Sequence, residues 1–187
     1  RASLVELNFL HEARTAERFR ENFANEPDIL IPQMYPKMST GRVLVIERIF
    51  GHKMDAFSCA EDLEALGFEA VPLVRRLLRI YIVQAYVHGL IHADLHPGNI
   101  FLLEDGSIAM IDFGLYTELE RGMQNALFRM VLYRSHFKHQ ELAEAMLDMM
   151  EPTEHADPLA YRKAIVALSK QGEGAPITEF SVAKSLQ

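Results

Sequence analysis

The sequence predicts an α+β fold that is mostly helical and carries one short β-hairpin. Two observations support this prediction. Two short apolar runs, 100–103 and 108–111, flank a four-residue turn that contains Asp105-Gly106, which is a strong hairpin signal. Elsewhere apolar residues recur at helical spacing, and the predicted helices are 3–23, 61–67, 72–88, 118–135, 140–149, 158–171 and a last start at Ile177.

The chain between the first two predicted helices is expected to be extended. Prolines interrupt the segment 29–35, whereas the β-branched run 42–49 predicts a regular strand. One apolar face of the helix 72–88 is predicted to be part of the core. This face consists of Val71, Val74, Leu78, Ile82 and Ala85.

Composition limits the class of protein. With 187 residues and 49% hydrophobic content, the chain has the size and apolar material of one globular domain. The net charge of −7 argues against nucleic acid as a partner. The single cysteine, Cys59, excludes an internal disulfide and suits a reducing compartment. No apolar run approaches the roughly 20 residues of a membrane-spanning helix, so no transmembrane segment is predicted.

The most informative stretch is Ile91–Ile100, which reads IHADLHPGNI, together with Ile111–Gly114, which reads IDFG. A Pro-Gly pair prevents a continuous helix through the first stretch. We therefore expect Asp94 and Asn99 on a loop and Asp112 at the end of a strand. The hairpin between the two stretches would bring these three oxygen-bearing side chains to one place.

The spacing of these residues matches the protein-kinase pattern of His-x-Asp, an Asn five residues later, and Asp-Phe-Gly. Asp94 is the predicted catalytic carboxylate, which orients the attacking hydroxyl or water. Asn99 and Asp112 are predicted to hold magnesium against the nucleotide phosphates, because magnesium prefers oxygen ligands. His92 belongs to the predicted catalytic set because its ring can hydrogen-bond the backbone near Asp112 and fix the loop.

An alternative interpretation uses the histidines. His88, His92 and His96 recur every four residues, which on one helix would form a ridge for a transition metal. Gly89 and the Pro-Gly pair lie within or beside that run and disfavour a continuous helix.

The stretch after Gly114 is short. Leu115-Tyr116-Thr117 leads almost directly into a predicted helix, with no Ala-Pro-Glu motif and no segment of twenty or so residues before it. A kinase that acts on protein substrates needs such a segment as a platform, so the sequence argues against a protein substrate.

The sequence resembles the UbiB-type atypical kinases, which are linked to ubiquinone biosynthesis and related isoprenoid-lipid metabolism. The resemblance runs from residue 3 to about 135. It is carried by Glu6-Leu7-Asn8, Glu12-Ala13, Glu17-Arg18-Phe19, Asn22-Phe23, Ile31-Pro32, Tyr35-Pro36, Ser39-Thr40, Arg42-Val43-Leu44, Glu47-Arg48, Gly51 and His92–Asn99. The family usually has Glu-x-Asp where this chain has Glu6-Leu7-Asn8, which leaves the role of Asn8 open.

The resemblance implies a truncated protein-kinase-like fold. Residues 1–50 would be a remnant of the upper lobe, a helix plus two strands, and residues 51–187 a mostly helical lower lobe that carries the catalytic-loop hairpin. Glu6 would pair with the nucleotide-binding lysine. The lysine strand and phosphate loop are expected upstream of Arg1, which would make the chain a middle slice of a longer protein.

The predicted function of the intact parent is an atypical kinase or ATPase that binds ATP and Mg²⁺ and supports quinone-lipid biosynthesis. The backbone of Glu47, Arg48 and Ile49 would border the adenine. The expected partners are a nucleotide and, through the parent, isoprenoid-quinone precursors or membrane lipids on the cytoplasmic side. Two alternatives remain: a small-molecule phosphotransferase of the aminoglycoside or choline type, and a pseudokinase-like nucleotide-binding module. The isolated chain is expected to be inactive.

Overall fold

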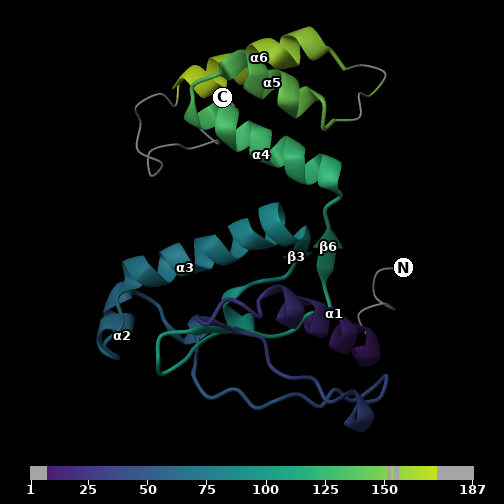
Figure 1. Ribbon diagram of the computed structural model, residues 1–187. Helices are drawn as coiled ribbons and strands as arrows, with labels where there is room; N and C mark the ends of the chain where they lie inside the picture. The colour runs from purple at the N-terminus through teal and green to yellow at the C-terminus, as the bar shows by residue number, and fades with distance from the viewer. Residues whose placement is uncertain (1–7, 151–152, 154–155, 172–187) are drawn as a thin grey trace. The chain divides into compact units, whose positions relative to one another are not determined.

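The computed structural model describes residues 8–150, 153 and 156–171 (Figure 1). The chain divides into two compact units, residues 1–119 and 120–187. The α+β prediction is confirmed, and the predicted lobe boundary after residue 50 stays a prediction. Glu6 and the predicted helix start at Ile177 lie outside the described residues.

The first helix in the described part of this unit is α1, Phe9–Asn22. The side-chain oxygen of Asn8 accepts a hydrogen bond from the backbone N–H of Leu10, at 3.2 Å. Asparagine and aspartate are both good residues at this capping position. The structure therefore gives Asn8 a local role that does not require a negative charge.

Two further helices follow, α2 at Ala60–Glu64 and α3 at Ala70–Val83, and α3 continues into a π-helical turn at Gln84–His88. Gly89 ends this turn with a φ of 65°, a left-handed conformation that glycine adopts without strain. The predicted core face of α3 is wrong. Its members Val71, Val74, Leu78 and Ile82 are 52–63% exposed, and Leu73, Ile80 and Gln84 are buried instead.

The first unit contains a four-stranded sheet in the order β1-β5-β4-β2. Its strands are β1 Ile29–Leu30, β2 His52–Lys53, β4 Ile100–Leu102 and β5 Ile108–Met110. β1 pairs parallel with β5, and the other pairs are antiparallel. The predicted hairpin is confirmed as β4–β5, and Gly106 in its turn has a φ of 81°. A second, two-stranded sheet joins β3, Leu90–His92, to β6, Tyr116–Glu118.

The predicted strand 42–49 is wrong, because this segment forms only the isolated bridges Thr40↔Val43 and Met34↔Ile46. The hydroxyls of Ser39 and Thr40 accept hydrogen bonds from the backbone N–H groups of Val45 and Val43. These side chains compete with a regular ladder for the same donors. Short 3₁₀ turns connect the elements of the unit at Pro36–Met38, Met54–Ala56 and Pro97–Asn99.

The second unit contains three helices in its described residues: α4 Arg121–Ser135, α5 His139–Leu147 and α6 Pro158–Gln171. All three were predicted, with bounds that differ by at most three residues. α5 packs against both α4 and α6 and buries Leu142, Ala143 and Ala145. Over both units, none of the helices that the structure describes is long and apolar enough to span a bilayer.

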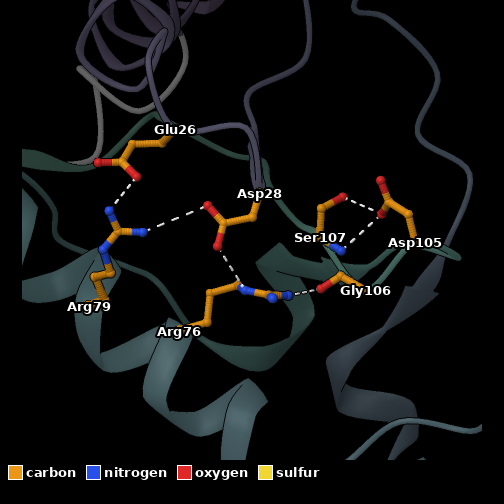
Figure 2. A network of polar contacts seen from close by, with 7 residues as sticks. All are labelled: Glu26, Asp28, Arg76, Arg79, Asp105, Gly106 and Ser107. Atoms are coloured by element: carbon orange, nitrogen blue, oxygen red, sulfur yellow. Dashed lines mark hydrogen bonds and ion pairs between the residues drawn. The ribbon is translucent and has the colours of Figure 1, made fainter.

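A polar network ties α3 to the rest of the first unit (Figure 2). Arg76 pairs with Asp28 at 2.9 Å and also donates to the backbone carbonyl of Gly106 in the hairpin turn. Arg79 pairs with Glu26 at 2.6 Å. The network therefore joins the segment after α1, helix α3 and the turn of the hairpin that carries the predicted site.

Replacing Arg76 by glutamine should lower the free energy of unfolding by about 1–2 kcal/mol. The ion pair with Asp28 is partly screened by solvent, but the Gly106 carbonyl would lose a charge-assisted donor. Arg75→Gln, at an exposed position on the same helix, is the control and should change stability by no more than about 0.5 kcal/mol. Urea unfolding, followed by circular dichroism, measures the free energy of unfolding of both variants. Equal effects of the two substitutions would contradict the role of the network.

Candidate functional site

A pocket of about 390 Å³ lies in the first unit between α1, the loop after β3 and the segment after β5. Asp94 and Asp112 both line it. Its full lining is Phe9, Glu12, Ile46, Asp94, Ile111, Asp112, Gly114 and Leu115. The two carboxylates predicted from the kinase-like spacing therefore share one pocket.

Asp94 lies on an exposed turn directly after β3. Its backbone N–H donates to Nδ1 of His92, at 3.2 Å, and its carbonyl accepts from the side-chain amide of Asn99, at 3.1 Å. Both backbone groups of Asp94 are thus held by neighbouring side chains, which leaves the exposed carboxylate on a fixed turn.

Asp112 follows β5 with a φ of 62°. This left-handed conformation is uncommon outside glycine, but aspartate adopts it more readily than most residues. Its Oδ1 accepts a hydrogen bond from the N–H of Gly114, at 3.4 Å. The next residue, Phe113, is fully buried against the rings of Phe19 and His92, with centroid distances of 5.0 and 5.2 Å. The buried ring anchors the strained backbone beside it.

The ring of His92 connects the two loops. Its Nε2 lies 3.0 Å from the carbonyl oxygen of Ile111, as predicted, and its Nδ1 accepts from Asp94. These partners assign the neutral tautomer with the proton on Nε2. Burial lowers the pKa of His92, although its bond to Ile111 and the nearby carboxylates oppose this. Gln84 completes the arrangement, because its Oε1 accepts from the backbone N–H of His92 at 2.7 Å.

Asn99 is 6% exposed and is not among the described residues that line the pocket. Its side-chain N–H donates to Asp94, and its backbone carbonyl accepts from the N–H of Ile111, at 3.0 Å. The structure thus places Asn99 between the two loops, next to the residue that precedes Asp112. Its role as a metal ligand stays a prediction.

Glu12 is the site residue that the sequence reasoning missed. A Cβ added at Gly114 would lie 3.4 Å from Oδ1 of Asp112 and 3.8 Å from Oε2 of Glu12, so the two carboxylates border the same small space. Burial and the charge of Asp112 raise the pKa of Glu12, and hydrogen bonding to the Phe113 backbone opposes the rise. Two negative charges about 7 Å apart repel by roughly 2 kcal/mol at an effective dielectric constant near 20.

A signal for Glu12 was present in the sequence. It lies next to Ala13 on the helical face that continues to Ala16 and Phe19, all of which are buried. An acidic residue at the edge of a buried helical face, on a helix before a kinase-like motif, fits the glutamate that pairs with a lysine in kinases. The predicted partner of that lysine, Glu6, lies outside the described residues.

Of the predicted adenine-bordering residues Glu47, Arg48 and Ile49, none lines the pocket, although the preceding residue, Ile46, does. Glu47 points elsewhere, because its Oε2 accepts from the N–H of Gln33 at 3.0 Å and it lines a separate hollow of about 340 Å³. The guanidinium of Arg48 lies 4.9 Å from the ring centre of Phe50. The role of the backbone from Glu47 to Ile49 therefore stays a prediction.

The alternative histidine ridge is wrong. His88 lies in the π-helical turn with its ring edge-on to Phe23, His92 lies in β3, and His96 accepts from the N–H of Gly98 at 3.1 Å. Among the residues that the structure describes, no three His, Cys, Asp or Glu side chains are grouped so that they could hold a metal ion.

The fold and the paired loops define a kinase-like protein. Comparison with known families matches residues 2–146 to the ABC1 atypical kinase-like domain, and the chain therefore belongs to the ABC1 atypical kinase-like family. The predicted resemblance and the predicted kinase-like fold class are thereby confirmed.

Similar proteins come from plants and bacteria. The chain is 31% identical to ACTIVITY OF BC1 COMPLEX KINASE 1, chloroplastic, of Arabidopsis thaliana over 95% of this chain and 26% of that protein. It is 32% identical to a probable protein kinase UbiB of Klebsiella pneumoniae over 78% of this chain and 27% of that protein. The chain thus spans about a quarter of the length of each of these relatives.

A solved structure supports the fold. The complex of Rv3197 with erythromycin from Mycobacterium tuberculosis aligns with a TM-score of 0.59 and 20% identity, over 90% of this chain and 42% of that one. At this level of identity the similarity shows the fold alone.

Glu12→Gln should raise the free energy of unfolding at pH 7.5 by a few tenths to about 1 kcal/mol. The pKa of Glu12 is higher in the folded than in the unfolded state. Above this raised pKa the Glu12 carboxylate is charged in both states, and its charge destabilises the folded state relative to the unfolded one. The gain should therefore disappear as the pH falls towards 4.5.

Glu17→Gln is the matched control on the same helix and should have the opposite sign. The hydrogen bond from Arg20 lowers the pKa of Glu17, so its charged form stabilises the fold at neutral pH. Urea unfolding at several pH values measures both variants. Destabilisation by Glu12→Gln at pH 7.5 would show that the two carboxylates do not repel in this way.

Proposed function

We propose that the parent protein of this chain binds ATP with Mg²⁺ and uses it for phosphoryl transfer or ATP hydrolysis, in support of isoprenoid-quinone biosynthesis. The observation that carries the proposal is that Asp94 and Asp112 line one pocket, with the carboxylate of Glu12 beside Asp112. The link to quinone biosynthesis rests on the resemblance to UbiB-type proteins and on the UbiB relative from Klebsiella.

The chemistry of the pocket supports a cation in it. None of the described residues that line the pocket is basic, although three of them are acidic. Magnesium prefers carboxylate and amide oxygens, which Asp112 and the adjacent Asn99 would supply. The bound ion would supply charge neutralisation of the nucleotide phosphates. A lysine paired with Glu12, as in protein kinases, would balance the remaining charge.

The chain's own residues have separable roles in this proposal. The carboxylate of Asp94 accepts a hydrogen bond from the attacking hydroxyl or water and orients it. His92 links the turn of Asp94 to the backbone before Asp112, because each of its two ring nitrogens hydrogen-bonds one of these segments. Ile46 contributes an apolar wall on the side proposed for the adenine.

The partners proposed for the parent are a nucleotide and isoprenoid-quinone precursors or membrane lipids, on the cytoplasmic side of a membrane. The family assignment supports this choice over an amino-sugar or amino-alcohol acceptor.

Asp94→Asn in the full-length parent should lower ATP turnover by roughly 10²–10⁴-fold and leave nucleotide binding intact, because the amide cannot accept the proton. Asp112→Asn should instead weaken magnesium-dependent nucleotide binding. Glu104→Gln, at an exposed position in the turn of the same hairpin, is the control and should change neither.

An ATP turnover assay measures the effect of Asp94→Asn, and calorimetry of ATP binding in the presence of Mg²⁺ measures that of Asp112→Asn. Normal turnover in Asp94→Asn would refute the role of Asp94. ATP binding by the wild-type parent without turnover of any kind would favour the pseudokinase alternative.

A further inference from the structure

Two residues of α1 contact the strand that follows Asp112. The ring of His11 stacks on that of Tyr116, with centroids 5.8 Å and planes 23° apart. The guanidinium of Arg18 lies 5.7 Å from the centre of the same ring and pairs with Glu118 at 2.7 Å. His11 and Arg18 are seven residues apart, which places them on one face of the helix, two turns from each other.

The strand that they contact, β6, is itself fixed to the catalytic loop. In the β3–β6 ladder Tyr116 lies directly opposite His92, whose ring connects the two site loops. The N–H of Ala93 donates to the carbonyl of Leu115, at 3.1 Å, and extends this pairing to the residue before Asp94. A side chain that contacts β6 is therefore linked, through β3 and His92, to the loops that carry Asp94 and Asp112.

One of the contacts between α1 and β6, that of His11 with Tyr116, lies in the first turn of α1, next to Glu12. The largest buried side chain of α1 is Phe19, which packs against Phe113; Ala13, Thr15 and Ala16 of the same helix are buried as well. Phe19 lies seven residues after Glu12, which is about 10 Å along a helix, so its packing acts at a distance from Glu12. The charge of Asp112 repels the Glu12 carboxylate, whereas a hydrogen bond with the Phe113 backbone favours its charged form. The stacking of His11 on Tyr116 adds a contact from β6 directly beside Glu12.

We propose that Tyr116 and Glu118 are positioning residues for α1: Tyr116 holds its first turn through His11, and Glu118 holds it two turns further on through Arg18, so that Glu12, between them, stays beside Asp112. The attachment is a property of the fold. Only its consequence for phosphoryl transfer rests on the proposed function.

Hydrogen exchange of the backbone amides in the 187-residue chain tests the attachment without any need for activity. In Tyr116→Ala the amides of residues 13–16 should exchange roughly 5- to 30-fold faster, because a stacked ring and a cation–π contact are lost. The amides of residues 20–23, next to the Phe19 anchor, should not change. Tyr116→Phe keeps the ring and should exchange like the wild type.

Charge reversal tests the ion pair in the same way. Arg18→Glu and Glu118→Arg should each speed exchange of residues 13–16. The double variant should slow it again in part, because it recreates the ion pair with opposite signs but not the contact of Arg18 with the Tyr116 ring. Unchanged exchange in Tyr116→Ala, or an equal increase along the whole of α1, would overturn the proposal, since either result shows no specific restraint of the first turns.

ATP turnover in the full-length parent tests the consequence. Tyr116→Ala should lower kcat about tenfold, and Tyr116→Phe should recover it. Unchanged kcat in Tyr116→Ala would remove the catalytic part of the proposal. Absence of turnover in the wild-type parent would instead refute the proposed function, and the exchange experiment would still decide whether α1 is attached.

Discussion

The imidazole of His92 is the contact on which the arrangement of the site depends. One ring nitrogen accepts from the backbone of Asp94 and the other donates to the carbonyl of Ile111, so a single neutral ring fixes the distance between two loops. Protonation of Nδ1 would place a second N–H donor against the N–H of Asp94 and break the hydrogen bond between His92 and Asp94. Burial beside Phe113 favours the neutral ring. The backbone N–H of His92 donates to Oε1 of Gln84, which holds the residue in place.

The same frame holds together groups that repel one another. Glu12 and Asp112 are both acidic and border one small space, and the raised pKa of Glu12 records the cost of this proximity. Packing of the fully buried Phe19 supplies the attraction that keeps α1 in place. Such local conflict between charges is expected where binding of a cation, rather than stability, has determined the residues. This conflict adds support to the proposal of a cation in the pocket that Asp94 and Asp112 line.

The local parts of this frame could be predicted from the sequence. Asp105-Gly106 specifies a turn by itself, so the hairpin followed from a few neighbouring residues, as did the bond from His92 to Ile111. Features that depend on how whole elements pack could not be predicted. Both faces of α3 are apolar, so its periodicity did not show that Leu73 and Ile80 face the core. The apolar face of α1 shows that Glu12 lies at the edge of the core, but its nearness to Asp112 depends on where α1 packs, which the helix's own sequence does not specify.

The most direct test is the protonation state of His92, measured by the ¹⁵N chemical shifts of its ring nitrogens in the 187-residue chain at pH 6.5. An ordinary histidine is half protonated at this pH. Because burial lowers the pKa of His92, the ring should be mostly neutral, with the proton on Nε2 and a bare Nδ1. A ring that is mostly imidazolium, or a neutral ring with its proton on Nδ1, would contradict the account.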